Sequence, residues 1–147
     1  MSEIIIKVFN NSDLQLPIYA HDGDSGVDLY ATHDYTVSPN NRAMIGTGLH
    51  VEIPKGYEIQ IRSRSGFAWK NGIFVLNSPG TIDYGFIAEI KIILFNTTDR
   101  MFEIKKGDRI AQAVLCPVYK IQWDKVNSLD ELNKTERNLG GFGSTGV

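Results

Sequence analysis

Hydrophobic and polar residues alternate along much of the chain in short stretches, a pattern that predicts β-strands. The stretches rich in β-branched or alternating residues are 3–9, 35–37, 43–53, 57–63, 72–77, 89–96 and 109–123. Turn-forming groups separate several of them, namely "HDGDSG" (21–26), "SPNN" (38–41) and "PKG" (54–56). Because the intervals are too short for crossover helices, we expect an all-β fold, an antiparallel sandwich or barrel, in place of a parallel α/β sheet.

Helical signals are few, and the C-terminal residues carry no periodic signal. The stretch "SGFAWKNG" (65–72) is the one helical candidate, and residues 128–138 could form a short helix or a loop. The chain ends in "GGFGSTGV", in which four of eight residues are glycine. Such an end is either disordered or a strap that orders on a ligand, since glycine costs the most backbone entropy to order. We predict a β domain over residues 1–134 and a flexible C-terminal arm over 135–147.

Composition narrows the classes of function. The length of 147 residues indicates one domain, and 42% hydrophobic residues suits a packed core. No apolar run approaches membrane-spanning length, and the start lacks the features of a signal peptide, so we predict a cytoplasmic protein without a membrane partner. The single cysteine, Cys116, excludes an internal disulfide, and its apolar neighbours predict a buried side chain. The net charge of −2 argues against a nucleic-acid partner but allows a small anionic ligand in a locally positive pocket.

Candidate chemistry concentrates in five stretches that are dense in glycine, aspartate, serine and arginine. They are "DSGVDLYA" (24–31), "RSGFAWKNG" (64–72), "NSPGTIDYGF" (77–86), "GDRIAQ" (107–112) and "RNLGGFGSTG" (137–146). Each alone has a structural explanation. Asp28 could cap a turn, Ser65 could cap a helix, and Asp83 could open a hairpin. The segment "KKGDR" (105–109) is typical of a surface β-turn.

Taken together, in this order and at this spacing, the five stretches resemble the motifs of the trimeric deoxyuridine triphosphatase (dUTPase) family. The resemblance extends from about Ile4 to Val147, and its most specific parts are "GTID" after Asn77, "GDRIAQ" and "GGFGSTG". It implies a jelly-roll-like β-sandwich that assembles as a homotrimer, with active sites between subunits and the arm of one subunit closing a site built by the others. It also implies hydrolysis of dUTP to dUMP and pyrophosphate with Mg²⁺, which limits uracil in DNA and supplies dUMP for thymidylate synthesis.

The resemblance assigns roles to two carboxylates. It makes Asp83 the general base that activates a water for attack on the α-phosphate, a task that a positioned carboxylate can perform. It places Asp28 near the metal-bound waters or in an orienting role. Magnesium would be held by phosphate oxygens and waters without a direct protein ligand, in keeping with its preference for few protein ligands.

Substrate-binding roles follow from the same resemblance. The triphosphate is strongly anionic, so guanidinium, hydroxyl, amide and backbone N–H donors should surround it. Phosphate contacts are expected from Arg64, Ser65, Gly66, Gln112, Arg137, Gly143, Ser144 and Thr145. Backbone groups from Asn77, Gly80 and Ile82 through Lys91 are expected to read the uracil edge. Phe86 would exclude a ribose hydroxyl, and Phe142 of the arm would stack on the base.

A few positions depart from the family pattern. Ser63 stands where a proline is usual, and Phe86 replaces a tyrosine. Ile87 and Ala88 replace an Arg-Gly pair, and Asn138 stands where a glycine is common. We expect the loss of that arginine to loosen the rim of the hairpin or the subunit contacts, and so to affect substrate affinity more than the chemistry.

Three other functions remain open. A deoxycytidine triphosphate deaminase of the same fold would need a carboxylate beside the base, and Glu89 is the acidic residue near the hairpin. A binding or regulatory module could keep the nucleotide pocket. A structural jelly-roll protein, such as a capsid subunit, would share the strand pattern but has no need of the five motifs.

Overall fold

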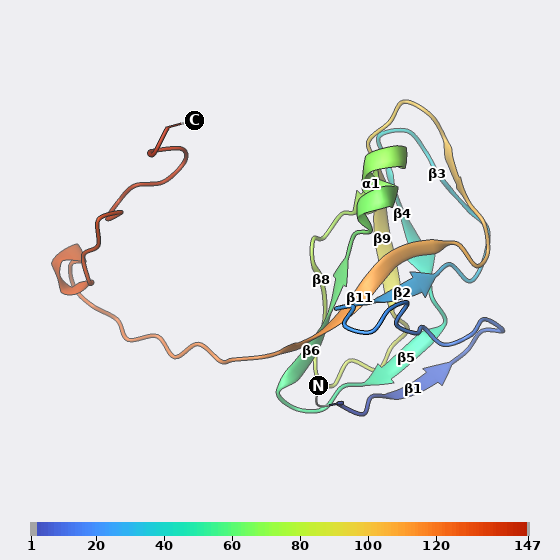
Figure 1. Cartoon of the computed structure of the whole chain (residues 1–147), viewed down its shortest axis with the longest axis horizontal. Coiled ribbons are helices and arrows are strands. Elements are labelled where there is room, and N and C mark those ends of the chain that lie inside the picture. Colours follow the sequence, from blue (N-terminus) through green and yellow to red (C-terminus); the bar gives the residue numbers. More distant parts are fainter. Residues whose placement is uncertain (1–2, 147) are drawn as a thin grey trace.

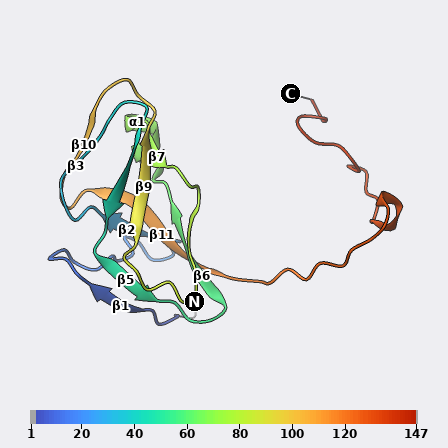
Figure 2. The ribbon, with the colours of Figure 1, turned by 180° about the vertical axis from the view of Figure 1, so that it is seen from behind.

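The computed structural model describes residues 3–146 as a β-sheet body followed by a long C-terminal segment that runs away from it (Figures 1 and 2). The strands are β1 (Lys7–Asn10), β2 (Val27–Tyr30), β3 (Tyr35–Val37), β4 (Arg42–Gly46), β5 (Leu49–Glu52), β6 (Tyr57–Arg62), β7 (Ile73–Val75), β8 (Gly80–Ile82), β9 (Lys91–Asn96), β10 (Phe102–Ile104) and β11 (Arg109–Pro117). One α-helix, α1 (Ser65–Asn71), and one 3₁₀-helix (Leu129–Glu131) complete the described chain. Within this range no helix has the length and apolar character needed to cross a membrane.

The strands form two larger sheets and two short ribbons. One sheet has the order β2-β11-β6-β8 and the other the order β4-β9-β7, while β1 pairs with β5 and β10 with β3. Every strand pairing in the described residues is antiparallel. The predicted all-β, jelly-roll-like sandwich is therefore confirmed, and none of the described sheets closes into a barrel.

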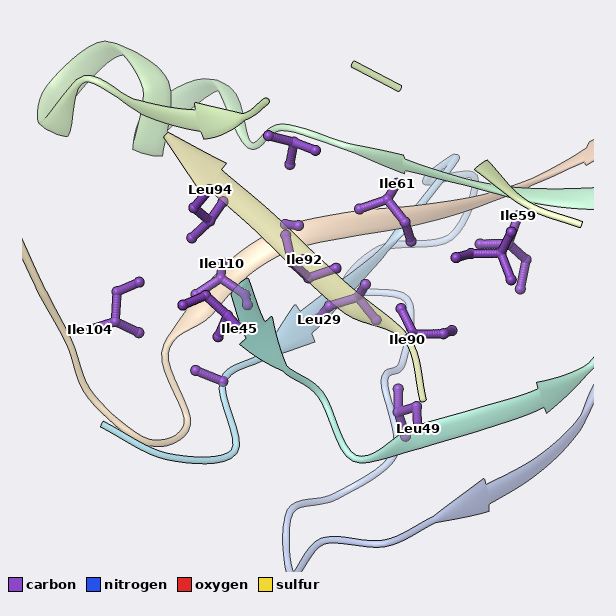
Figure 3. Close-up of a cluster of buried hydrophobic side chains, with 14 of the residues drawn as sticks. Leu29, Ile45, Leu49, Ile59, Ile61, Ile90, Ile92, Leu94, Ile104 and Ile110 are labelled. Atoms are coloured by element: carbon purple, nitrogen blue, oxygen red, sulfur yellow. The ribbon is translucent and has the colours of Figure 1, made fainter. Parts of the chain in front are cut away.

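The hydrophobic core lies between the sheets and follows the period-two pattern of the strands. In β9, Ile92 and Leu94 are buried, while Ile93 and Phe95 on the other face are half-buried. Figure 3 shows side chains from β9, β11, β2 and β4 gathered in one cluster, among them Ile110 and Leu29. Burying such a side chain contributes about 1.5–3 kcal/mol, so this cluster is the main source of stability.

A buried amide ties the loop after β9 to the core. Asn96 is fully buried, and its Nδ2 donates to the carbonyl oxygens of Val37 at 3.0 Å and Arg100 at 2.7 Å. Its Oδ1 accepts from the backbone N and the hydroxyl of Thr98, at 2.9 and 2.8 Å. All of the polar atoms of this side chain are thus hydrogen-bonded, as a buried amide requires.

Several local expectations need correction. The stretch 43–53 forms two strands because the chain turns at Gly48, where φ is +70°. Ser65 is the first residue of α1 and does not cap it; the cap position is Arg64, which makes no side-chain cap bond. Cys116 is half-buried and not buried as its apolar neighbours predict. The helix prediction itself is confirmed, and α1 ends at Gly72 in the left-handed conformation.

The C-terminal segment leaves the body earlier than the predicted boundary. Strand β11 ends at Pro117, and the last hydrogen bond to the body joins the Val118 N–H to the Gly56 carbonyl at 2.8 Å. In residues 119–146 every hydrogen bond stays within the segment, including the capping box of Ser128 and Glu131 on the 3₁₀-helix. The boundary between 134 and 135 lies inside this segment and stays a prediction. The outer bounds of the two predicted parts, residues 1 and 147, lie outside the described residues.

Candidate active site

A charged cluster lies at one end of the β2-β11-β6-β8 sheet. Asp28 sits on β2, directly opposite Gln112 of β11. Arg64, just beyond β6, donates from Nε to Asp28 Oδ1 at 2.9 Å. Arg109, the first residue of β11, approaches the other oxygen of Asp28 from Nη1 at 3.5 Å, and its carbonyl accepts from Arg64 Nη1 at 3.2 Å. Asp28 therefore does not cap a turn: it pairs with two arginines from a strand position.

The cluster carries a net positive charge in a half-buried setting. Two guanidinium groups share one carboxylate, and the side chains of Arg64 and Asp28 are 29% and 25% exposed. Partial burial reduces screening by water, and guanidinium groups bind phosphate oxygens through several N–H donors. An anion is therefore the ligand that this end of the sheet suits best.

Gln112 forms a hydrogen bond to the connection between β6 and α1 that carries Arg64. Its Nε2 donates to the Ser63 carbonyl at 2.9 Å, and the Ser63 hydroxyl accepts from the Val75 N–H at 2.9 Å. Gly26 lies so close to Gln112 Oε1 that a Cβ there would be 2.9 Å from it. Ser63, which lies between β6 and α1, is thus held by both β11 and β7. It stands just before Arg64 and the predicted phosphate-binding residues Ser65 and Gly66 at the start of α1.

The predicted catalytic base lies on the loop that joins β8 to β9. Asp83 follows β8 directly and is exposed, and its carbonyl accepts from the Phe86 N–H at 3.1 Å to close a tight turn. Gly85 in this turn has a φ of +89°, which glycine adopts without strain. Phe86 is 42% exposed, so its ring can form one wall of a pocket. Of the other predicted base-reading positions, Gly80 and Ile82 lie on β8, Asn77 precedes it, and Lys91 begins β9.

Within one chain, Asp83 is remote from the charged cluster. Gln112 on β11 lies opposite Asp28, whereas the last residue of β8 pairs through β6 with Leu115. Asp83, one residue further along, is therefore level with Cys116 of β11. Cys116 lies four residues along the strand from Gln112. At about 3.3 Å per residue the separation along the sheet is about 13 Å. One subunit thus brings Asp28, Arg64 and Gln112 together but does not bring them to Asp83.

The arm residues lie away from both groups in the single chain (Figures 1 and 2). Arg137 Nε donates to the Gly140 carbonyl at 3.1 Å, and Phe142 is fully exposed. Ser144 donates its backbone N–H to the Gly141 carbonyl at 3.0 Å. Arg137, Phe142, Gly143, Ser144 and Thr145 therefore share one segment, which is not in contact with the predicted pocket residues of the same chain.

Two partners of the site were not predicted from the sequence. Arg109 belongs to the "GDRIAQ" stretch, but only its glutamine was assigned a role. Ser63 was seen only as a departure from the family pattern, although its hydroxyl and carbonyl tie Gln112 and β7 to the loop. Across residues 3–146 there is no group of three or more His, Cys, Asp or Glu side chains placed to hold a metal ion.

An antiparallel sandwich with an arginine-flanked carboxylate and a glycine-rich arm defines an all-β protein with a positively charged cluster suited to an anion. The family model described as dUTPase matches residues 6–146, and the chain belongs to that family. Relatives named deoxyuridine 5'-triphosphate nucleotidohydrolase include one from Clostridium tetani, 47% identical over 147 residues and covering 99% of each chain. Another, from Hydrogenobaculum sp., is 51% identical over 136 residues and covers 92% of each chain.

Solved structures show the same fold. The Staphylococcus bacteriophage 80alpha dUTPase with dUPNHPP is 27% identical, with a TM-score of 0.85 over 97% of this chain and 99% of that one. A dUTPase mutant from phage phi11 of S. aureus is 23% identical, with a TM-score of 0.77 over 86% of this chain and 99% of that one. The latter structure is described as revealing the coordination of a structural Mg(II) ion.

Proposed function

We propose that the chain hydrolyses dUTP to dUMP and pyrophosphate. The observation that carries this proposal is the positive cluster of Asp28, Arg64 and Arg109 beside Gln112. It lies in a chain whose curated relatives at 47–51% identity carry the name of this activity. The reaction would remove dUTP as a source of uracil in DNA and supply dUMP for thymidylate synthesis, so we place the enzyme inside the cell, in its nucleotide pool.

The triphosphate would bind at the charged cluster. Arg64 can exchange part of its contact with Asp28 for phosphate oxygens, and Ser65 and Gly66 at the start of α1 offer a hydroxyl and a backbone N–H. A Cβ added at Gly66 would meet nothing within 4 Å, so its backbone is open to a ligand. Gln112 would hold this loop in place or turn its amide toward phosphate. Arg137, Gly143, Ser144 and Thr145 of an arm would then cover the outer phosphate.

Asp83 would be the general base of the reaction. Its exposed carboxylate can accept a proton from a water that attacks the α-phosphorus. As the new P–O bond forms, the bond from the α-phosphorus to the bridging oxygen breaks and pyrophosphate leaves. The proton passes from the water to the carboxylate oxygen of Asp83, so charge and atoms balance.

We propose that the active form is a homotrimer with shared active sites. The offset of about 13 Å along the strand direction between Asp83 and the level of Gln112 supports this, because within one chain Asp83 lies apart from the cluster. A complete site would then take Asp83 from one copy and the cluster from another. The outer face of the β4-β9-β7 sheet is also apolar. It carries Met44, which is 59% exposed, next to Ile93, and Phe95 packed against Phe74 with ring centroids 5.8 Å apart. Such a face is typical of a surface buried between subunits.

Magnesium is the proposed cofactor, and the residues of the cluster fit it. Asp28 Oδ2 meets Arg109 only at 3.5 Å, longer than a normal charge-assisted hydrogen bond, so this oxygen can accept from a metal-bound water. When bound, Mg²⁺ neutralises negative charge on the phosphate oxygens. Asp28 would orient that water, while Arg64 holds Asp28 in place.

The base and sugar would be selected by the β8 region and an arm. Backbone groups from Asn77, Gly80 and Ile82 to Lys91 can match the donor and acceptor edge of uracil. The ring of Phe86 would occupy the space of a ribose 2′-hydroxyl. Phe142 from an arm would stack on the uracil ring and exclude water.

The test is a substrate panel with product identification. We expect dUTP to be hydrolysed much faster than UTP, dTTP or dCTP, with pyrophosphate and not orthophosphate as the product. Hydrolysis that does not distinguish dUTP from UTP would contradict the sugar selection by Phe86. Tight dUTP binding without any turnover would favour a binding module.

A deaminase is the alternative with a specific test, the release of ammonia from dCTP. Its candidate carboxylate, Glu89, already accepts a hydrogen bond from the Gly48 N–H at 3.0 Å and is 28% exposed. Glu89 therefore helps to hold the loop in place, which argues against a catalytic role at the base.

A further inference from the structure

The loop between β8 and β9, which carries Asp83 and Phe86, is held at its far end by the start of β5. The Gly48 N–H donates to Glu89 Oε1 at 3.0 Å, and the Ile90 N–H donates to the Leu49 carbonyl at 2.8 Å. The hydroxyl of Thr47 donates to the Ile90 carbonyl at 2.6 Å. Residues 89–90 are therefore fixed to a buried part of the sandwich.

The tip of the same loop has far fewer constraints. Between residues 84 and 88, the structure describes two hydrogen bonds: the turn bond from Phe86 N to Asp83 O, and a bond between His50 Nδ1 and the Ile87 carbonyl at 2.9 Å. The Ile87 side chain is 69% exposed, so packing does not fix it. The second bond is thus what joins the tip to the sandwich.

His50 is well placed to act as an anchor. Because a carbonyl oxygen can only accept, Nδ1 must carry the proton and donate. The ring lies on β5, and its partner in the β1-β5 ribbon is Phe9, directly opposite, with ring centroids 5.6 Å apart at 45°. The imidazole thus contacts Phe9 while its Nδ1 lies within hydrogen-bond distance of the loop.

The anchor acts where the family pattern is broken. Ile87 and Ala88 stand in place of the usual Arg-Gly pair, so neither side chain can form an ion pair. The group that remains for a contact between this part of the loop and the sandwich is the backbone carbonyl of Ile87. Phe86 is the adjacent residue, and consecutive Cα atoms are about 3.8 Å apart, so a shift of Ile87 moves the Phe86 ring.

We propose that His50 is a positioning residue that sets the place of the Phe86 ring and thereby the discrimination between deoxyribose and ribose. This role rests on the proposed function of Phe86 in rejecting the 2′-hydroxyl. Steric rejection depends on the distance between ring and sugar, and a loop tip released from β5 can withdraw far enough to admit one oxygen atom. His50 does not touch substrate: it acts through the carbonyl of Ile87.

The experiment compares two substitutions that separate the hydrogen bond from the ring contact. His50→Phe keeps an aromatic ring against Phe9 but has no donor, whereas His50→Gln has an amide donor but no ring. The kcat/KM values for dUTP and UTP are measured with each variant. For His50→Phe we expect the dUTP-to-UTP ratio to fall about tenfold, mainly through a lower KM for UTP, and for His50→Gln to retain most of the ratio.

A matched control and a second measurement keep the outcome clear. His33→Phe makes the same substitution at another surface histidine, whose Nδ1 lies 2.9 Å from the hydroxyl of Thr32, and should leave the ratio unchanged. Hydrogen exchange of the peptide over residues 83–90 should be faster in His50→Phe and unchanged in His33→Phe. This measurement does not depend on enzymatic activity, so it can be made even where the activity of a variant is low.

The possible failures are distinguishable. An unchanged ratio and unchanged exchange in His50→Phe would overturn the role of His50. An equal loss in His50→Phe and His50→Gln would also overturn it, since the donor would then not matter. If the unsubstituted enzyme itself fails to distinguish dUTP from UTP, the sugar selection by Phe86 is wrong, and the exchange data still decide whether His50 anchors the loop.

Discussion

At the scale of single residues, the central feature is one carboxylate shared by two guanidinium groups. Removing a partner from a half-buried ion pair leaves a charge without compensation, so Asp28 and Arg64 depend on each other for their positions. Asp83, exposed at the end of β8, forms no ion pair with any residue of the described range 3–146. The two carboxylates therefore differ in environment, one held in an ion pair and the other free to take part in proton transfer.

This contrast predicts the effect of Asp83→Asn. The amide has nearly the same shape but cannot accept a proton from water, so turnover of dUTP should fall about 10²–10⁴-fold while nucleotide binding is largely kept. Steady-state kinetics and equilibrium binding of a non-hydrolysable dUTP analogue measure the two effects. Asp99→Asn, at a position that is 92% exposed in a distant loop, serves as the control. A loss of less than tenfold would show that Asp83 is not the base.

The sequence allowed some of these residues to be predicted and not others. Through the family resemblance, Arg64 and Gln112 were predicted to contact phosphate and Asp28 to act near the metal-bound waters or to orient the site. The three residues do lie together. The contacts of Arg109 and Ser63 depend on which strands are neighbours, and the spacing within one stretch does not contain that information. The same holds for His50, which meets Ile87 from a strand 37 positions earlier in the chain.

At the scale of elements, strand β11 organises the molecule. Its nine residues pair with both β2 and β6, so one strand places the charged cluster at one end and carries the chain toward the arm at the other. Long alternating stretches such as 57–63 and 89–96 were predicted well, because they cross the core with one face buried. Strands β2, β8 and β10 were missed, since three or four residues contain few alternations. The equally short β3 was predicted from its β-branched residues.

The buried amide after β9 leads to a prediction about stability. Asn96→Ala would leave the carbonyls of Val37 and Arg100 and the N–H of Thr98 without their partner. Each buried polar group without a partner costs about 1–3 kcal/mol, so the free energy of unfolding should fall by about 3 kcal/mol or more. Urea denaturation at fixed protein concentration measures this loss. Asn71→Ala, at the exposed end of α1, should change the free energy by less than about 0.5 kcal/mol, and equal losses would contradict the role of Asn96.

At the scale of the whole molecule, the predicted site residues fall into three groups that one chain keeps apart. The charged cluster lies at one end of the β2-β11-β6-β8 sheet, Asp83 lies about 13 Å along it, and the arm extends away from the body (Figure 1). The family resemblance implied sites shared between subunits, but residue spacing within one chain does not show which motifs one copy brings together. The sheet keeps the first two groups apart within one chain, so the proposed shared site would take them from different subunits.

Mixed assemblies test this arrangement. Two variants, Asp83→Asn and Arg64→Gln, are each expected to be nearly inactive alone, one for lack of the base and the other for lack of a phosphate-binding guanidinium. If each site takes Asp83 from one subunit and Arg64 from another, co-refolding at equal amounts gives sites with both intact residues. Random mixing in a symmetric trimer makes about one quarter of the sites intact, so about a quarter of the original activity should return.

The control and the opposite result are both well defined. Co-refolding Asp83→Asn with a chain that carries both substitutions should restore nothing, since no subunit then supplies Asp83. A site built within one chain would have a defect in every copy, and the first mixture would then stay inactive although mass measurements show mixed trimers. Recovery in the first mixture only would mean that assembly overcomes the distance between Asp83 and Arg64 within one chain. Each site would then combine the Arg64 of one subunit with the Asp83 of another, because the sheet of a single subunit keeps these two residues apart.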